Sequence, residues 1–212
     1  MESKNFLNLW LVPRNSPLKA ISKEEELFSK EISGPRKEEY IFSRGYLREV
    51  LSTSLGIKPL TIPIQADLGK PPQIKGNKGC ISMSHSLSYL FISWSSENIG
   101  VDIENIDRTI EARSLIKRFF FKEEEKKIFL LDKQNINQEF IKYWVLKEAC
   151  IKLRKGSLAK DISRIKIIND CLAVHTSDSE SIYLRSIFLN NHILGIASKQ
   201  KSFLDNIILC NY

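Results

Sequence analysis

Gly100-Val101-Asp102-Ile103-Glu104 closes an apolar run and places two carboxylates two residues apart. Residues i and i+2 of a β-strand project from the same face, roughly 6.6 Å apart. The spacing therefore predicts a strand over 99–104 with Asp102 and Glu104 side by side at its end. Such carboxylates are common as solvated charges, so this stretch needs a partner elsewhere in the chain before it indicates a site.

The helical stretch 143–152 (YWVLKEACIK) supplies that partner. Trp144, Glu148 and Lys152 follow one another at intervals of four and therefore share one stripe of a helix. In isolation, Glu148 and Lys152 are more simply interpreted as a surface ion pair, and Trp144 as a core residue. Combined with the strand, they add a third carboxylate and a cation. Mg²⁺ prefers carboxylates, water and phosphate oxygens as ligands, so the combination favours a magnesium and phosphate site.

Periodicity and turn residues predict the remaining elements. On the N-terminal side we expect strands at 6–12, 81–86 and 89–94 and helices at 21–28 and 36–55. On the C-terminal side we expect helices at 110–121, 122–131 and 138–155 and strands at 162–168, 173–175, 182–188 and 192–198. Two turns are also expected, a hairpin turn at 95–98 and a turn at 135–137. The similar order of elements predicts an α+β fold of two halves, 1–98 and 99–212.

The composition limits the class of protein and of partner. The 212 residues include 32 Lys and Arg against 25 Asp and Glu, a net charge of +7. This excess favours a negatively charged ligand or partner and leaves nucleic acid, a phosphorylated small molecule and an acidic protein open. The four cysteines lack zinc-ligand or disulfide spacing, which favours reduced thiols in the cytoplasm. No run approaches the roughly 18 apolar residues of a membrane span, so we expect a soluble protein without a membrane partner.

A histidine between two serines is a second candidate for phosphate contact. Ser84 and Ser86 flank His85 directly after an apolar run. Hydroxyls and backbone amides at such a turn donate hydrogen bonds to phosphate, although a structural turn histidine is an equally good interpretation. The segment Gly69-Lys70-Pro71 is by itself only a turn.

Two long motifs resemble the signatures of the 4'-phosphopantetheinyl transferases of the surfactin-synthetase-activating type. These signatures are G-[IV]-D-x-E and, further along the chain, W-x-x-K-E-[AS]-x-x-K. The chain matches both at every position, over 100–104 and 144–152. Shorter segments resemble other motifs of the family, at 43–48, 69–71, 81–86 and 118–124. The segment 81–86 departs from its motif by Ile and Ser in place of Phe and Asn.

The resemblance implies a pseudo-twofold pair of similar α+β halves with the active site in the cleft between them. It also implies Mg²⁺ as cofactor and coenzyme A as substrate. The 4'-phosphopantetheine group would pass to a serine of an apo acyl or peptidyl carrier protein, releasing adenosine 3',5'-bisphosphate. Carriers of fatty acid, polyketide and nonribosomal peptide synthesis share this chemistry, and we lean to the fatty acid carrier because the pathway always requires it. Two internal halves also allow the cleft to form within a monomer.

The matching positions carry the family's roles into this sequence. Asp102, Glu104 and Glu148 would hold the metal together with the pyrophosphate of coenzyme A. Glu148 would also be the base for the incoming serine. Lys152 would contact the pyrophosphate and assist the leaving group, and Lys147 would add a second positive charge near the metal.

The nucleotide end of coenzyme A would lie against the N-terminal half. By resemblance, Lys70, Pro71, Ser84 and His85 line it, with His85 near a phosphate. The half of the chain that follows the carboxylate strand would dock the carrier protein. Basic residues available there are Arg108, Arg113, Lys117 and Lys122.

One position departs from the family in a way that concerns the 3'-phosphate of coenzyme A. Family members often carry arginines about nine residues before the position of Arg48, whereas this chain has Glu39 there. A small shift of register would let Arg36 take the role. Arg44 is the other candidate.

Two other classes of protein compete with this interpretation. A magnesium-dependent nuclease or phosphodiesterase also combines carboxylates with a lysine, but usually places that lysine on a strand. A non-catalytic nucleic-acid-binding module would need a stacking aromatic motif or a continuous basic stripe, and the sequence has neither. We therefore expect no nucleic acid partner.

Overall fold

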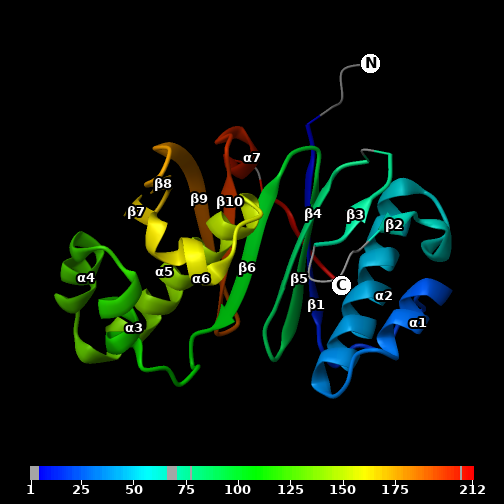
Figure 1. The fold of residues 1–212 in the computed structure, drawn as a ribbon, viewed down its shortest axis with the longest axis horizontal. Helices are drawn as coiled ribbons and strands as arrows, with labels where there is room; N and C mark the ends of the chain where they lie inside the picture. Colours follow the sequence, from blue (N-terminus) through cyan, green and yellow to red (C-terminus); the bar gives the residue numbers. More distant parts are fainter. Residues whose placement is uncertain (1–4, 66–70, 77, 206) are drawn as a thin grey trace.

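The structure is a computed structural model that describes residues 5–65, 71–76, 78–205 and 207–212. It confirms the α+β class. Two sheets pack against each other in the middle of the molecule, with a long helix on the outer side of each (Figure 1). No helix of the described chain is both long and apolar enough to cross a membrane.

The first sheet belongs mainly to the N-terminal half. Its strands, in spatial order, are β11 (Leu209–Asn211), β1 (Leu7–Pro13), β5 (Tyr89–Ser95) and β4 (Cys80–His85). A small separate ribbon pairs β2 (Ile64–Gln65) with β3 (Gln73–Ile74). The outer helices are α1 (Lys23–Ser29) and α2 (Pro35–Leu55), and a 3₁₀ turn follows at Pro59–Thr61.

Alternation along β1 explains how this sheet is buried on both faces. Trp10 and Val12 pack with α2, whereas Leu9 and Leu11 pack against the second sheet. Successive strand residues point to opposite faces, so one apolar run serves two layers of the core.

The second sheet carries the predicted carboxylate strand at its edge. Its order is β6 (Ile99–Asn105), β10 (His192–Ser198), β9 (Glu180–Leu189), β8 (Leu172–His175) and β7 (Ile165–Asn169). The helices of this half are α3 (Ala112–Phe119), α4 (Lys122–Phe129), α5 (Lys133–Leu153), α6 (Leu158–Asp161) and α7 (Ser202–Asp205). Helix α5 is buried mainly over β6 and β10 and provides much of the core of this half.

Two expected turns are wrong. Residues 95–98 do not form a hairpin, because β6 pairs along its whole length with β10 and β5 lies in the other sheet. The free edge of β6 instead meets β4, where the Val101 backbone N–H donates to Ser82 Oγ at 3.1 Å. The turn at 135–137 is also wrong, since these residues form the first turns of α5.

The last strand crosses the expected division between the halves. β11 pairs in parallel with β1, with Leu9 opposite Leu209, so residues 209–211 lie in the first sheet. The division into 1–98 and 99–212 therefore does not follow the sheets at its C-terminal end. The pseudo-twofold relation between the halves stays a prediction.

Candidate active site

Strand β6 and helix α5 bring the two sequence motifs together because a glycine lets their backbones touch. A Cβ built on Gly100 would lie 1.8 Å from the carbonyl oxygen of Ala149. A Cβ on Gly195, in the neighbouring strand, would lie 2.6 Å from Val145 and 2.9 Å from its carbonyl oxygen. The glycine of the first motif is thus required by close packing under α5, one residue from Glu148.

Alternation along β6 then divides its side chains between two layers. Val101 and Ile103 point into the core between the sheets. Gly100 faces α5, so Asp102 and Glu104, at intervals of two, lie on the α5 side of the strand. The predicted common face of the two carboxylates is consistent with this arrangement.

Asp102 is the buried centre of the cluster. Its Oδ1 accepts a hydrogen bond from Ser84 Oγ at 2.5 Å and forms an ion pair with Lys152 Nζ at 2.7 Å. Its Oδ2 is buried and has no hydrogen-bond partner in the described structure. Buried carboxylate oxygens are normally satisfied, so this atom points to a missing cation or donor.

The surroundings of Glu148 strongly disfavour the charged form of its carboxyl group. Burial raises its pKa to about 7, and the negative charge of Asp102 acts in the same direction. Lys152 opposes the shift, as does the hydrogen bond that Trp144 Nε1 donates to Glu148 Oε1 at 2.7 Å. A carboxylate with such a pKa is suited to accept a proton near neutral pH.

Glu104 completes the acidic group nearer the surface. Burial raises its pKa, and Asp102 adds to the shift, while the cation of Arg108 lowers it. Arg108 Nη1 lies 2.6 Å from Glu104 Oε1, one helical-turn interval further along the chain. In the sequence Arg108 is expected only as a docking residue, although its position four residues after Glu104 is visible there.

The donor set suits Mg²⁺ by its chemistry. Three carboxylates whose charges oppose one another, with one orphaned buried oxygen, are stabilised by a divalent cation. In the described part of the chain, no three such side chains converge into a ready metal cage. Lys152 and Arg108 are the cations that now neutralise Asp102 and Glu104.

The interpretation of Lys147 as a charge near the metal is wrong. Its side chain is fully buried, forms an ion pair with Glu124 at 2.9 Å and donates to the carbonyl oxygen of Ile165. The ammonium also lies over the rings of Phe120 and Phe121. Successive helix residues point about 100° apart, so Lys147 faces the core while Glu148 faces β6.

A cavity of about 750 Å³ lies beside the carboxylates, between the start of α2, the end of β4 and the end of β6. Its lining includes Glu104 and Arg108 on one side and Glu39 and His85 on the other. His85 Nε2 lies 2.9 Å from Glu39 Oε2, so the predicted phosphate contact is paired with a carboxylate. Arg14 also lines the cavity, a residue that no local sequence pattern singled out.

The other predicted coenzyme A contacts are not gathered at this cavity. Arg36 is exposed at the start of α2 and is not among the lining residues. Arg44 is buried, with its guanidinium 5.1 Å from the centre of the Tyr40 ring, and likewise does not line it. Pro71 is exposed. Lys70 lies outside the described residues.

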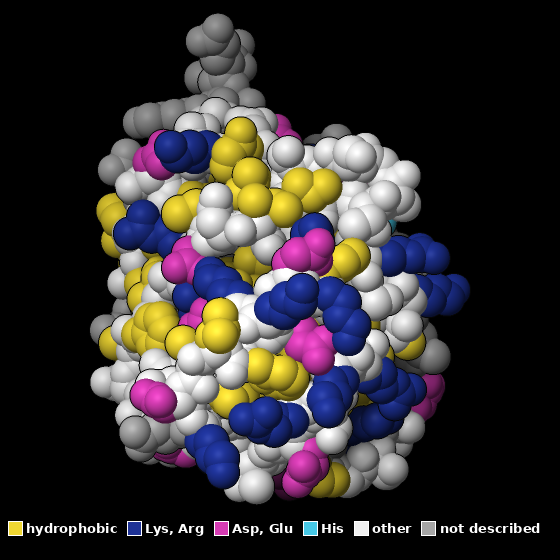
Figure 2. Space-filling model, turned by 90° about the vertical axis from the view of Figure 1, so that its left-hand side faces the viewer, with side chains coloured by type: hydrophobic (Ala, Val, Ile, Leu, Met, Phe, Trp, Pro, Cys, Tyr) yellow, Lys and Arg dark blue, Asp and Glu magenta, His cyan; other side chains and the backbone are white. Residues whose placement is uncertain are grey.

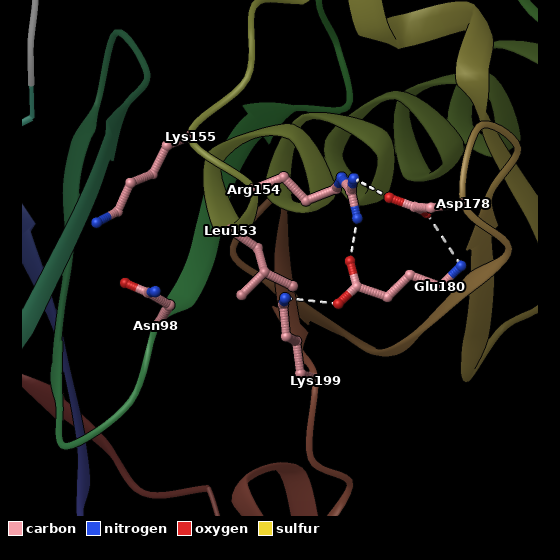
Figure 3. A pocket seen from close by; sticks show the side chains of 7 residues that line it. All are labelled: Asn98, Leu153, Arg154, Lys155, Asp178, Glu180 and Lys199. Atoms are coloured by element: carbon pink, nitrogen blue, oxygen red, sulfur yellow. Dashed lines mark hydrogen bonds and ion pairs between the residues drawn. The ribbon is translucent and has the colours of Figure 1, made fainter.

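A separate pocket at the C-terminal end of α5 is lined by charges that neutralise one another (Figure 3). Arg154 contacts Asp178 at 2.5 Å and also Glu180, and Lys199 contacts Glu180 at 2.5 Å. Figure 3 shows Lys155 on the opposite side from these pairs. The charged side chains of this pocket are therefore mainly paired with one another.

One face of the C-terminal half is rich in basic side chains. Figure 2 shows Lys and Arg gathered among exposed apolar groups on the side where α3, α4 and β7 lie in Figure 1. Arg113 and Lys117 are exposed on α3, and Lys122 is exposed at the start of α4 beside Glu125. Leu130, directly after α4, is also exposed.

Known proteins resemble this chain over the region that contains the carboxylates. Residues 98–197 match the sequence model of the 4'-phosphopantetheinyl transferase superfamily. The chain is 26% identical over 170 residues to the 4'-phosphopantetheinyl transferase HetI of Nostoc sp., covering 73% of this chain and 70% of HetI. It is 28% identical over 152 residues to AcpT of Escherichia coli O157:H7, covering 71% and 75%. It is 26% identical over 136 residues to Sfp of Bacillus subtilis, covering 62% and 60%. AcpT and Sfp are also 4'-phosphopantetheinyl transferases by name. The region that matches the superfamily model, residues 98–197, contains β6 and α5.

Proposed function

Through residues 98–197 the chain belongs to the 4'-phosphopantetheinyl transferase superfamily, and on this premise we propose which groups it transfers and how. The donor is coenzyme A, and the acceptor is a serine of an apo acyl or peptidyl carrier protein. The products are the holo carrier and adenosine 3',5'-bisphosphate. The observation that carries the proposal is that Glu148 and Lys152 of α5 both interact with Asp102 of β6, beside a cavity that Glu104 lines.

The reaction is a displacement at the phosphorus that bears the pantetheine arm. The serine hydroxyl oxygen forms a bond to this phosphorus, and the bond to the bridging oxygen of the pyrophosphate breaks. Mg²⁺, when held by Asp102, Glu104 and Glu148, supplies positive charge to the pyrophosphate oxygens. The orphaned Oδ2 of Asp102 supports this assignment.

Glu148 takes the proton of the serine hydroxyl. In the metal-free protein its pKa is raised to about 7, so the group is a stronger base than an ordinary carboxylate and is still partly ionised at neutral pH. The hydrogen bond from Trp144 Nε1 holds Oε1 in a fixed direction. The sequence alone assigned Trp144 to the core.

Lys152 stabilises the leaving phosphate. Its ammonium is partly exposed and is held 2.7 Å from Asp102 Oδ1. A fixed ammonium beside the bridging oxygen lowers the barrier by neutralising charge as it develops there. Coenzyme A binding would draw Lys152 from Asp102 toward the phosphate, which would leave Asp102 Oδ1 available as a metal ligand.

The carrier protein would dock on the basic face of the C-terminal half (Figure 2). Carrier proteins are typically acidic, and Arg113 and Lys117 are exposed there. Complementary charge accelerates encounter and selects orientation. We favour the carrier of fatty acid synthesis as the acceptor.

Mass spectrometry of an apo acyl carrier protein tests the proposal directly. Incubation with the protein, coenzyme A and Mg²⁺ is expected to add one phosphopantetheine to the carrier. The Glu148→Gln variant should fold but lose roughly 10²–10⁴-fold in rate, since a proton acceptor is removed. Glu139→Gln, on the same helix in a surface pair with Lys142, is the matched control and should keep the rate. Cleavage of a nucleic acid or another phosphodiester, with no mass gain, would instead support the phosphodiesterase class.

A further inference from the structure

The cavity beside the carboxylates has a second charged end that the transfer chemistry does not use. Arg14, Glu38, Glu39 and His85 line this end, which comes from the residue after β1, from α2 and from β4, and not from β6. Arg108 is already bound to Glu104, and His85 is bound to Glu39. Among the described lining residues, Arg14 is thus the cation without an ion pair to a carboxylate.

Arg14 is fixed by its backbone and by a ring contact, and one of its hydrogen-bond donors has no partner among the described residues. Its backbone N–H donates to the carbonyl oxygen of Ser88 at 2.8 Å, which fixes the chain directly after β1. Its guanidinium lies 4.7 Å from the centre of the Phe42 ring. The Nη1 atom is buried and makes no hydrogen bond within the described residues. A planar guanidinium with free donors is the side chain best suited to bind a phosphate.

Glu39 has the opposite effect at the same end. Its carboxylate lies 2.9 Å from His85 Nε2, so an incoming anion must compete for the imidazole. A phosphate dianion near Glu39 is also repelled by like charge. Arg14 and Glu39 therefore act on the same ligand group with opposite signs.

The proposed donor places a definite group at this end. If the pyrophosphate of coenzyme A lies against Glu104, the nucleotide extends along the cavity toward His85, because both residues line one space. The nucleotide end of coenzyme A bears the 3'-phosphate on its ribose. We infer that Arg14 binds this 3'-phosphate and that Glu39 limits its affinity, so that the two residues set the preference between coenzyme A and 3'-dephospho-coenzyme A. This inference rests on the proposed transferase function.

Steady-state kinetics with the two donors tests the inference, using the full chain, Mg²⁺ and a saturating apo acyl carrier protein. For Arg14→Gln we expect the KM for coenzyme A to rise roughly tenfold, the loss of one charge-assisted contact. The KM for 3'-dephospho-coenzyme A should not change. For Glu39→Gln the KM for coenzyme A should fall roughly threefold, again without effect on the dephosphorylated donor.

Two variants control for charge and position. Lys30→Gln removes an exposed cation just after α1, and Glu26→Gln removes an exposed carboxylate on α1; neither lines the cavity. Both should leave the two KM values unchanged. Equal shifts for both donors in Arg14→Gln, or a selective shift in Lys30→Gln instead, would overturn the assignment of Arg14. Unchanged donor preference in Glu39→Gln would overturn the role of Glu39.

Product binding separates this inference from the proposed function. Isothermal titration calorimetry compares adenosine 3',5'-bisphosphate with adenosine 5'-monophosphate and requires no transfer. Arg14→Gln should weaken the binding of adenosine 3',5'-bisphosphate and leave the binding of adenosine 5'-monophosphate unchanged. If neither donor modifies the carrier, the transferase proposal fails, and the calorimetric difference still decides whether Arg14 binds the phosphate. If transfer proceeds and Arg14→Gln binds both nucleotides like the wild type, only the inference fails.

Discussion

Glu148 lies where burial and neighbouring carboxylates both oppose its negative charge. Its pKa in the folded state is raised from 4.5 to about 7, chiefly by burial and next by Asp102. The folded protein therefore holds a proton in a pH range where the unfolded chain has released it. The stability from this group is fully present below pH 4.5 and is lost as the pH rises through about 7.

We expect this loss to be visible in unfolding experiments. Without divalent cations, the free energy of unfolding of the wild type should fall by roughly 3 kcal/mol relative to Glu148→Gln as the pH rises from about 4.5 to about 8. Mg²⁺ should restore most of it at the higher pH, because a bound cation offsets the carboxylate charge. Urea unfolding of both proteins, with EDTA or with Mg²⁺, measures the difference. If the free energy of unfolding of the wild type and of Glu148→Gln changed with pH in the same way, the raised pKa of Glu148 would be contradicted. Glu139→Gln is the control and should follow the wild type.

The sequence predicts the cluster of carboxylates and Lys152 better than the walls of the cavity, for a physical reason. Strand and helix periodicities are local, so the common faces of Asp102 with Glu104 and of Glu148 with Lys152 can be predicted from spacing. The position of Arg14 depends on the pairing of β1 with β5, which no local pattern specifies. Lys147 is adjacent to Glu148 in its motif, yet it points about 100° away around the helix and pairs with the buried Glu124.

At the level of elements, the contact of β6 with α5 sets the geometry of the site. Gly100→Ala would force a methyl group against the carbonyl oxygen of Ala149 and push the helix away from the strand. We expect about 1–3 kcal/mol of destabilisation from this overpacking. Because a misplacement of about 1 Å can cost roughly 10²-fold in rate, transfer by the folded variant should fall further than stability alone explains.

Gly76→Ala is the matched control for that variant. Gly76 has a φ of 86° and no atoms within 4 Å of an added Cβ, so alanine strains the turn without moving a helix. It should lose stability but keep the transfer rate. Rates are compared at a temperature where circular dichroism shows both variants folded. Full activity of folded Gly100→Ala would show that α5 can shift without disturbing Glu148.

The buried ion pair of Lys147 and Glu124 joins α5, α4 and β7. Glu124 accepts hydrogen bonds from the backbone N–H of Phe121 at 2.8 Å and of Ile167 at 2.7 Å, while Lys147 donates to Ile165. Burial lowers the pKa of Lys147, and Glu124 opposes the shift. Lys147→Met leaves a buried carboxylate without its cation, so we expect a loss of about 3–5 kcal/mol in urea unfolding.

The double variant Lys147→Met/Glu124→Gln distinguishes charge from packing. It removes both charges while an amide oxygen can still accept a backbone hydrogen bond, so most of the lost stability should return. The transfer rate of the folded double variant should remain within a few-fold of the wild type. A rate loss like that of Glu148→Gln would mean that Lys147 acts on the substrate after all.

At the scale of the whole molecule, long-range strand pairing is what the sequence does not reveal. The elements themselves follow from periodicity, and β10 occupies the residues expected for it, 192–198. Periodicity does not predict which strands pair with β5 and β6, because a short apolar strand has no local signal for its neighbours. The same holds for β11, which returns from the C-terminal end to the first sheet. The cavity depends on these pairings, since its walls come from both halves.

The distribution of charge over the molecule leads to a prediction about encounter with the carrier. The chain carries +7, and α3 and α4, which bear exposed cations, lie at the opposite side of the molecule from α1 (Figure 1). With coenzyme A saturating, kcat/KM for an acidic carrier should fall roughly tenfold between about 50 mM and about 300 mM salt, because the ions screen this attraction. The double variant Arg113→Glu/Lys117→Glu should start lower and depend less on salt. Lys23→Glu/Lys30→Glu changes net charge equally on α1 and just after it, and should behave nearly as the wild type. Equal losses in the two double variants would mean that net charge, and not the basic face, attracts the carrier.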